Sequence, residues 1–376
     1  MKLAMVYDVI HPYVIGGVQK RNWEIARRLV KRGHDVTLFG MKHWEGSAIK
    51  YSEGVRLWGV CPPQDLFKDG RRSIREAMYF ACRLFPSLTR ERFDVVEVAN
   101  FPYFPCFAAA FCCLIRRSRL VITWHEVWGD YWYEYLGKKG VLGKAVEAMA
   151  ARLPHSAIAI SPHTMAGLMK LGLRNAQVVG CGVDMAAIAS VPRGPEPSDI
   201  IYVGRLAQEK NVAQLLRAIG ILMKSGSRTC CLIIGEGPER QALERQAGEL
   251  GIGAGVRFLG RVENDADLYS YMKASRVLVQ SSTREGFSHV VLEANACGIP
   301  VITVNHPHNA AKDLVTDGLN GFVCDQSDSD MAQKIARALS TGGWEERCRQ
   351  FAASCDWDAI ADVAEKLYLE AWGARP

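Results

Sequence analysis

Short apolar segments alternate with longer segments of helical periodicity along most of this chain of 376 residues. Lys2–Asp8 is predicted to be a buried strand, and the helix that follows opens at Gly16-Gly17 and closes at Gly33. The next predicted strands are Asp35–Gly40, Asp94–Val98, Leu120–Thr123 and Ala157–Ser161. Strands that alternate with helices are joined by crossover connections, so the pattern predicts a parallel, doubly wound α/β sheet.

The alternation lapses over residues 185–198, where Ala, Pro, Gly and Ser dominate, and we interpret this segment as a linker. It then restarts with predicted strands at Ile200–Val203, Cys230–Gly235, Val256–Leu259, Arg276–Gln280 and Pro300–Val304, and with predicted helices at Ala213–Lys224, Glu239–Leu250, Asp267–Ala274 and His289–Ala296. The length suits two domains of roughly 180 residues. We therefore predict one Rossmann-like domain over residues 1–184, another over 199–355, and a helix at 356–376 that packs back on the first domain.

Cysteine spacing and net charge restrict the class of protein to which this chain can belong. The twelve cysteines show no C-x-x-C spacing, and Cys112–Cys113 and Cys230–Cys231 lie inside apolar runs. This predicts small buried residues in a reducing compartment, the cytoplasm, rather than zinc ligands or disulfides. Met1–Val183 holds 26 Lys and Arg against 15 Asp and Glu, a net charge of +11, whereas the remainder carries −5. A basic first half fits an anionic membrane surface or polyanion, but no nucleic-acid motif accompanies it.

Neither a targeting segment nor a membrane span is predicted. Met1–Val9 carries a single Lys and runs directly into a strand pattern, without the regions of a signal peptide. The longest uncharged run, Val98–Ile115, is interrupted by Asn100, Pro102 and Pro105, and its remaining apolar part is too short to cross a bilayer core of roughly 30 Å. We interpret this run as a buried helix or strand.

The most specific motif begins at Glu285 and reads Glu-Gly-Phe-Ser-His-Val-Val-Leu-Glu-Ala, with Cys-Gly-Ile-Pro following from Cys297. Glu285 lies in a predicted loop after a strand, and Glu293 lies on the helix that follows. The amides of Gly286–His289 are then donors at a helix start, suited to a phosphate or a sugar hydroxyl. Two carboxylates can accept hydrogen bonds from the vicinal diols of a sugar or a ribose. On these residues alone, Glu293 as a cap and Glu285 as a solvated side chain remain an alternative.

The spacing Glu-x7-Glu, with Gly-Phe after the first Glu and Gly-x-Pro after the second, resembles the signature of retaining family-4 glycosyltransferases, the glycosyl transferases group 1. Further motifs follow in that family's order along nearly the whole chain: Gly16-Gly17-Val18-Gln19, Thr123-Trp124-His125, Gly182-Val183-Asp184, Val203-Gly204-Arg205-Leu206 with Glu209-Lys210-Asn211, Ile234-Gly235-Glu236-Gly237-Pro238, Phe258-Leu259-Gly260 and Asp317-Gly318-Leu319-Asn320-Gly321. The resemblance implies the GT-B fold, in which two doubly wound domains enclose an interdomain cleft. It also implies transfer of a hexose-type sugar from a nucleotide diphosphate, UDP or GDP, to an acceptor.

The resemblance assigns the second domain to donor binding. Arg205 and Lys210 would clamp the donor diphosphate, where fixed cations stabilise the charge that accumulates on the leaving group. Without the resemblance, these two residues are equally well explained as solvated charges. Glu293 would hold the ribose hydroxyls. Glu285 would hold the donor sugar together with the segment Gly286, Phe287 and Ser288.

Three further positions are assigned on the same basis. Gly16 and Gly17 would let the backbone approach the phosphates, because a Cβ there would collide with them. His125 would contact the donor sugar, although a single His is more often structural. Val262, just after the strand that ends at Gly260, falls where the family contacts the base through its main chain.

The implied mechanism retains the anomeric configuration by front-face attack through an oxocarbenium-like state. The departing phosphate helps to take the acceptor proton, so the protein supplies positioning and charge stabilisation, and we name no nucleophile and no cofactor. Asp265-Ala266-Asp267 could bind a metal but falls at a predicted helix start, where Asp is favoured as a cap, so we expect no metal. Gly235–Arg240 lacks the third glycine of a dinucleotide fingerprint. The alternatives to a transferase are a non-catalytic nucleotide- or carbohydrate-binding protein of the same fold and a pyridoxal-dependent phosphorylase.

The acceptor is expected to be a glycan or a lipid-linked molecule of cell-surface glycan or glycolipid synthesis. Aromatic faces stack on sugars and also lie at lipid interfaces. Such side chains crowd one segment after a strand end, and of these we predict Trp128, Tyr131 and Trp132 as acceptor-binding residues, with packing between a loop and the core as the alternative. Together with the basic first half and Arg71, Arg72, Arg75, Arg116, Arg117 and Arg119, they predict a cytoplasmic enzyme on the inner face of the membrane.

Two segments depart from the family pattern. Cys181 replaces the usual Asn before Gly-Val-Asp. His306-Pro307-His308-Asn309 replaces a glycine-rich loop after Val304. Because the second segment is expected near the donor-sugar wall, it bears directly on which sugar the donor carries.

Overall fold

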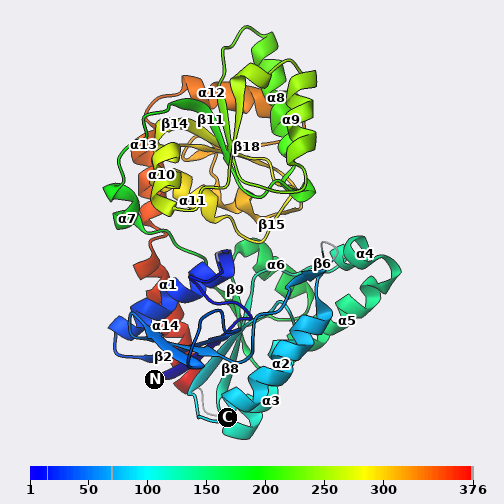
Figure 1. Cartoon of the computed structure of the whole chain (residues 1–376), viewed down its shortest axis with the longest axis vertical. Helices are drawn as coiled ribbons and strands as arrows, with labels where there is room; N and C mark the ends of the chain where they lie inside the picture. Colours follow the sequence, from blue (N-terminus) through cyan, green and yellow to red (C-terminus); the bar gives the residue numbers. More distant parts are fainter. Residues whose placement is uncertain (15, 69–70, 374–376) are drawn as a thin grey trace. The chain divides into compact units, whose positions relative to one another are not determined.

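The computed structural model describes residues 1–14, 16–68 and 71–373 and divides the chain into two compact units (Figure 1). The first unit contains Met1–Cys181 and the chain from Trp357 onward, and the second contains Gly182–Asp356. Each unit is a parallel sheet covered by helices, so the predicted α/β class with two Rossmann-like domains is confirmed.

Among the described residues of the first unit, eight strands form one sheet in the order β10-β9-β8-β7-β1-β2-β4-β3. Its neighbours are parallel except for the antiparallel pair β3–β4. The strands are β1 (Lys2–Val6), β2 (Asp35–Gly40), β3 (Ile49–Ser52), β4 (Val55–Gly59), β7 (Val95–Ala99), β8 (Arg119–Trp124), β9 (Ser156–Ala159) and β10 (Ala176–Val178). A separate short pair joins β5 (Phe67–Lys68) to β6 (Arg71–Arg72).

The helices of this unit are α1 (Gly17–Lys31), α2 (Ile74–Leu88), α3 (Phe104–Arg116), α4 (Tyr131–Leu136), α5 (Gly140–Ala151), α6 (Pro162–Lys170) and α14 (Trp357–Gly373), with a 3-10 turn η1 (Gly137–Lys139). The last helix, α14, packs beside the first, α1. Arg32 on the turn after α1 pairs with Glu365 of α14 at 2.7 Å, and the Tyr368 and Leu367 side chains of α14 are buried in the same cluster as Ile25 of α1. The final helix therefore completes the core of the first unit.

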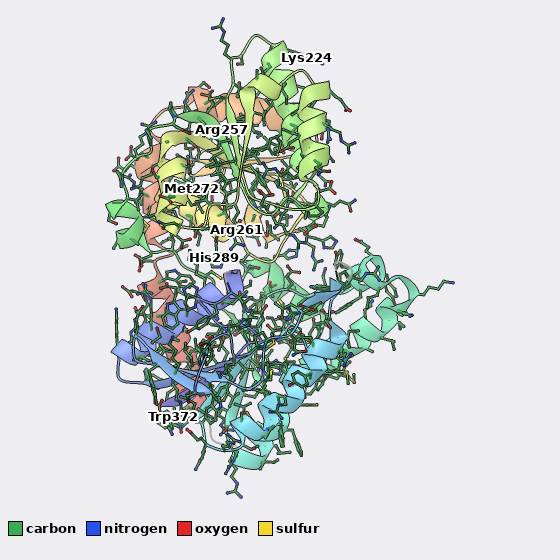
Figure 2. All side chains as sticks on the ribbon, viewed as in Figure 1. Lys224, Arg257, Arg261, Met272, His289 and Trp372 are labelled. Atoms are coloured by element: carbon green, nitrogen blue, oxygen red, sulfur yellow. The ribbon has the colours of Figure 1, made fainter. Side chains whose placement is uncertain are left out.

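In the second unit, the described residues form a six-stranded parallel sheet in the order β13-β12-β11-β14-β16-β18. Its strands are β11 (Ser198–Val203), β12 (Cys231–Ile234), β13 (Val256–Gly260), β14 (Ser275–Gln280), β16 (Val301–Val304) and β18 (Gly321–Cys324), and a short parallel pair joins β15 (Arg284–Glu285) to β17 (His308–Asn309). The helices are α7 (Met185–Ser190), α8 (Val212–Lys224), α9 (Arg240–Glu249), α10 (Asp265–Ala274), α11 (His289–Ala296), α12 (Asp328–Ser340) and α13 (Trp344–Ala353), with 3-10 turns η2 (Gln208–Lys210), η3 (Gly253–Gly255) and η4 (Ala310–Leu314). Met272 of α10, labelled in Figure 2, is fully buried against this sheet.

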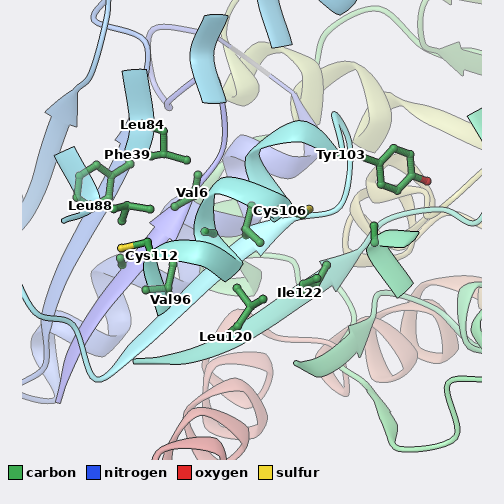
Figure 3. Close-up of a cluster of buried hydrophobic side chains, with 14 of the residues drawn as sticks. Val6, Phe39, Leu84, Leu88, Val96, Tyr103, Cys106, Cys112, Leu120 and Ile122 are labelled. Carbon is green, nitrogen blue, oxygen red and sulfur yellow. The ribbon is translucent and has the colours of Figure 1, made fainter. Parts of the chain in front are cut away.

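Helices α2 and α3 cover one face of the first sheet (Figure 3). Leu84 and Leu88 of α2 are fully buried beside Cys112 of α3, and these side chains meet Phe39 and Val96 from the strands. Apolar residues recur at helical spacing on the inner faces of both helices, which is why these segments form helices against the sheet.

The segment predicted as a linker, residues 185–198, belongs to the second unit and begins with helix α7. The Asp184 carboxylate caps this helix by accepting a hydrogen bond of 2.9 Å from the Ala187 amide, and Ile188 is fully buried. The chain leaves the first unit at Cys181 and returns to it at Trp357. A run rich in small residues thus folds onto the second unit because Asp184 caps its helix and Ile188 is buried.

In two further places the structure exposes residues that the sequence predicted to be buried. All twelve cysteines are free thiols, but Cys82 and Cys230 are exposed rather than buried. The uncharged run Val98–Ile115 forms the end of β7 and most of α3, yet Leu114 on α3 is 76% exposed. Among the described residues, no helix has the length and apolar character needed to cross a bilayer.

Candidate active site

Backbone hydrogen bonds tie together the loops at the carboxyl ends of three neighbouring strands in the second unit. After β11, the Leu206 amide donates to the Glu236 carbonyl, which follows β12, at 2.9 Å. The Gly235 amide donates to the Gly260 carbonyl at the end of β13 at 2.8 Å. Arg205 lies within this layer of loops and is exposed, so hydrogen-bonded loops present its cationic side chain to solvent.

Two glycines allow these loops to touch. A Cβ on Gly235 would lie 1.9 Å from the Gly204 carbonyl oxygen, and a Cβ on Gly237 would lie 2.1 Å from that of Leu206. Gly235 also has a φ of +142°, which side chains disfavour. The Gly-x-Gly after β12 therefore allows the loop that carries Arg205 to pack closely against the loop after β12.

Lys210 and Glu285 form an ion pair with 2.6 Å between Nζ and Oε1. The same Oε1 accepts hydrogen bonds from Gln280 Nε2 at 2.8 Å and from Ser282 Oγ at 2.9 Å. The two charged side chains are largely buried, with 20% and 11% of their surface exposed. Among the described groups, no donor is assigned to Oε2 of Glu285, so this oxygen can accept a hydrogen bond from a ligand.

The segment that departs from the family pattern lies next to this pair. Strand β15 runs parallel to β17, with Glu285 opposite Asn309 and Arg284 opposite His308. Asn309 is fully buried, and its Oδ1 caps η4 by accepting a hydrogen bond of 3.1 Å from the Ala311 amide. The His-Pro-His-Asn sequence is therefore a structured neighbour of the Glu285 loop.

Helix α11 begins directly after this loop. Gly286, Phe287 and Ser288 connect Glu285 to the helix, and Ser288 occupies the position before its first residue, where the first amides of a helix lack helical partners. Glu293 on α11 is 8% exposed, and its Oε1 accepts a hydrogen bond of 3.4 Å from Tyr269. Val262, in the loop after β13, packs on the same apolar cluster as Phe287. The predicted donor-binding residues of this domain thus come together at the carboxyl edge of one sheet.

The first unit places its predicted residues at the carboxyl ends of its own strands. Gly16 is the residue before α1, and Gly17 is the first residue of that helix. His125 follows β8, and its amide donates to Oδ1 of Asn100 at 2.9 Å. Asn100 is 1% exposed and also donates from Nδ2 to the Glu126 carbonyl at 3.0 Å. We did not single out Asn100 from the sequence, although its place at a strand end is a signal for a functional residue.

A buried charged network links these elements. Glu97, in β7, accepts hydrogen bonds at Oε1 from Arg21 of α1 at 3.2 Å and from Thr123 of β8, and at Oε2 from Tyr368 of α14 at 2.6 Å. Burial opposes the charge on Arg21, but the neighbouring Glu97 carboxylate outweighs it and raises the pKa of the guanidinium. Burial, reinforced by Glu97, raises the pKa of Tyr368, so its hydroxyl stays protonated and donates. The helix that begins at Gly17 and the strand that leads to His125 are thereby held by one carboxylate.

The aromatic segment is partly a packing feature, and Trp132 differs from the sequence expectation. Trp132 is 6% exposed, and a Cβ on Gly143 would lie 2.2 Å from its ring, so α5 covers the indole face that an acceptor would need. Trp128 and Tyr131 remain partly exposed, with their rings 5.2 Å apart. The Trp128 amide donates to Oε1 of the buried Glu147 at 2.8 Å. Glu147 is a structural carboxylate that no motif in the sequence marks.

The Asp265-Ala266-Asp267 triplet lies in the first turn of α10, where acidic side chains complement the helix dipole. The cap itself is Asn264, which accepts from the Ala266 amide at 2.9 Å, rather than either Asp. In the part of the chain that the structure describes, no group of three or more His, Cys, Asp or Glu side chains is arranged to hold a metal ion.

Two family models match the chain, and together they extend over residues 15–354. The model described as Glycosyltransferase Family 4 matches residues 15–187, and the model described as Glycosyl transferases group 1 matches residues 186–354. The chain therefore belongs to the family-4 glycosyltransferases of GT-B fold and is a glycosyltransferase.

Relatives cover nearly all of the chain. It is 26% identical to a glycogen synthase of Mycobacterium tuberculosis, over 99% of this chain and 95% of the relative. It is also 26% identical to a phosphatidyl-myo-inositol mannosyltransferase of Propionibacterium freudenreichii, with the same shares. Among solved structures, the sucrose-phosphate synthase of Thermosynechococcus elongatus superimposes with a TM-score of 0.81 at 18% identity, over 99% of both chains. Anabaena HepE in complex with UDP and glucose gives a TM-score of 0.74 at 19% identity, over 98% of this chain and 99% of HepE.

Proposed function

We propose that the protein is a retaining glycosyltransferase that moves a hexose-type sugar from UDP or GDP to a glycan or lipid-linked acceptor in cell-surface glycan or glycolipid synthesis. The observation that carries this proposal is the arrangement at the carboxyl edge of the second sheet. There, Lys210 is paired with Glu285 at 2.6 Å, beside a loop layer that presents the exposed Arg205. The two relatives that match the chain over nearly its full length support the proposal, since one is a glycogen synthase and the other a phosphatidyl-myo-inositol mannosyltransferase.

In the proposed reaction, the bond from the anomeric carbon to the diphosphate oxygen breaks and a bond to an acceptor oxygen forms on the same face of the sugar. Arg205 and Lys210 stabilise the negative charge that the leaving diphosphate gains. The acceptor proton passes to the departing phosphate. Oε2 of Glu285 accepts a hydrogen bond from a donor-sugar hydroxyl, because Oε1 is already occupied by its three donors.

The remaining predicted residues keep their roles within this proposal. The amides of Gly286, Phe287 and Ser288 bind the donor at the start of α11, and Glu293 accepts from the ribose. Gly16, Gly17 and His125 act on the donor from the first unit, and Val262 contacts the base. Trp128 and Tyr131 bind the acceptor. The reaction needs no metal, and the protein works at the inner face of the membrane.

The test is thermal stabilisation of the full chain by UDP, GDP, ADP and CDP. We expect one uridine or guanosine nucleotide to raise the melting temperature, and the Arg205→Ala/Lys210→Ala double variant to lose that shift. Arg257→Ala is the matched control, because Arg257 is an exposed cation on β13 that pairs with Glu196. Donor turnover should persist in excess chelator.

Three outcomes would overturn parts of the proposal. No shift with any of the four nucleotides would reject the donor site. A shift without turnover of the matching nucleotide sugar would indicate a binding protein rather than an enzyme. Inversion of the anomeric configuration in the product, observed by NMR, would reject the retaining mechanism.

A further inference from the structure

Helices α2 and α3 present large apolar side chains to solvent. On α2 these are Ile74, Met78 and Tyr79, and on α3 they are Phe111, Leu114 and Ile115; we refer to these six residues as the α2–α3 face. The two helices lie side by side, and the Phe85 and Phe111 rings stack across them with 5.5 Å between centroids. The exposed side chains of α2 and α3 therefore lie on two neighbouring helices that are in contact through Phe85 and Phe111.

The inner faces of the same helices already form the core. Leu84 and Leu88 of α2 and Cys106 and Cys112 of α3 are buried against the sheet (Figure 3). A surface helix of a soluble domain normally has polar residues opposite its buried stripe. On α2 and α3, apolar residues occupy the outer face as well as the inner face, so packing of the core does not explain the outer ones. Exposed apolar patches of this kind mark binding surfaces.

The exposed charged side chains of these two helices are positive. Arg75 and Arg83 on α2 and Arg116 and Arg117 at the end of α3 are exposed or half-buried, and none of the four pairs with a carboxylate of the described residues. The two helices, both fully described, contain one acidic residue, Glu76, and it is buried. Any partner of this face must therefore be both apolar and anionic.

We propose that the α2–α3 face docks the protein on an anionic lipid bilayer. Apolar side chains enter the boundary between headgroups and acyl chains, while arginines bind lipid phosphates, as in interfacial amphipathic helices. The inference rests on the proposed function for the lipid-linked acceptor and deepens it by naming the surface.

Charge complementarity excludes a second copy of the chain as the natural occupant. A twofold contact through this face would bring the arginines of one copy against those of the other. Without intervening carboxylates, such like charges repel.

A cavity of about 800 Å³ adjoins the carboxyl end of α3 and, like the α2–α3 face, is lined by apolar and positively charged side chains. Leu114 and Trp372 supply apolar lining, and Arg92, Arg117 and Arg119 supply positive charge (Figure 2 labels Trp372). Asp94 also lines the cavity, but its carboxylate accepts a bond of 2.7 Å from the Lys2 amide. The combination of cations and apolar walls suits the phosphate and first methylenes of a lipid.

The experiment is co-sedimentation of the full chain with vesicles of phosphatidylcholine alone or mixed with phosphatidylglycerol. We expect binding to the anionic vesicles that weakens as salt is added, and little binding to phosphatidylcholine. Met78→Glu/Leu114→Glu and Arg75→Glu/Arg83→Glu should each weaken the partition coefficient about tenfold or more. The control is Ile221→Glu/Lys224→Glu on α8, which alters an exposed apolar residue and a cation of the second unit and should bind as the parent does.

Equal loss in the control and face variants, or unchanged binding of the face variants, would overturn the proposal. A dimer that light scattering detects in the parent and not in the Met78→Glu/Leu114→Glu variant would assign the face to self-association instead. The nucleotide stabilisation assay is run on the same variants. Intact nucleotide shifts with lost vesicle binding support the docking face, whereas absent shifts in every protein indicate failure of the transferase proposal alone.

Discussion

Tyr368 donates a hydrogen bond of 2.6 Å to Glu97, although 271 residues separate them in the chain. Glu97 is 2% exposed and Tyr368 is fully buried, so neither group can turn to water if the other is removed. The bond is one of three that satisfy this buried carboxylate, with Arg21 and Thr123 as the other donors. It joins the last helix of the chain to the middle of the first sheet.

The Tyr368→Phe variant tests this bond with almost no change of shape. We expect a loss of about 1–3 kcal/mol in the free energy of unfolding, because Glu97 keeps its burial but loses a donor. Urea titration measures the loss, and Lys366→Ala, an exposed change on the same helix, should stay within about 0.5 kcal/mol of the parent. Equal stability of Tyr368→Phe and the parent would mean that the bond contributes nothing.

Arg205→Ala should lower turnover by about 10²–10³ if the guanidinium stabilises the leaving diphosphate. Arg205 is exposed and carries no ion pair with the described residues, so its removal should leave the melting temperature unchanged. Steady-state kinetics with the matching nucleotide sugar give the effect. Turnover close to that of the parent would reject the assigned role.

Gly143→Ala should destabilise the first unit. The new Cβ would lie 2.2 Å from the Trp132 ring, and overpacking of this kind costs about 1–3 kcal/mol. Thermal unfolding measures the cost, and Trp132→Phe in the same chain should recover part of it by shrinking the ring. A stable Gly143→Ala variant would show that Trp132 can move and would reopen its proposed contact with the acceptor.

Acid should weaken the first unit through Glu91. The hydrogen bond from Arg56, at 2.8 Å, holds the pKa of the Glu91 carboxyl below its ordinary value. The ionised form is therefore favoured by folding, so its contribution is present above the unfolded-state pKa and is lost as the pH falls through the folded-state pKa. Glu91→Gln should be less stable by about 1 kcal/mol at pH 7 and converge on the parent in acid. The control is the exposed Glu45→Gln, which should stay within about 0.5 kcal/mol of the parent at pH 7.

Much of this fold could be predicted because strands and helices leave periodic apolar patterns. Asp35–Gly40 and His289–Ala296 have the predicted bounds, since a cap or glycine ends each pattern. The β3–β4 hairpin and α7 were missed, because Ile49–Ser52 has few apolar residues and α7 is a single capped turn among small residues. Periodicity also cannot tell an apolar residue on the outer face of α3 from one on the inner face when both are apolar.

At the site, the motif residues could be identified from the sequence, but the side chains that hydrogen-bond to them could not. Gln280 and Ser282, which hold Glu285, precede the motif by a few residues and look like ordinary polar residues at a strand end. Glu147, which accepts a hydrogen bond from the Trp128 amide, lies 19 residues away on helix α5. Such partners are set by the folded geometry, and no local spacing marks them.

The return of the chain to the first unit at Trp357 has a consequence for its biosynthesis. The amino-terminal segments leave the ribosome first. Tyr368, which donates a hydrogen bond to Glu97, is made only after the whole second unit. During translation, the earlier-made part of the first unit thus lacks α14, and Glu97 lacks one of its three donors. The second unit is continuous in sequence from Gly182 to Asp356, so all of its residues are made before the last helix of the first unit.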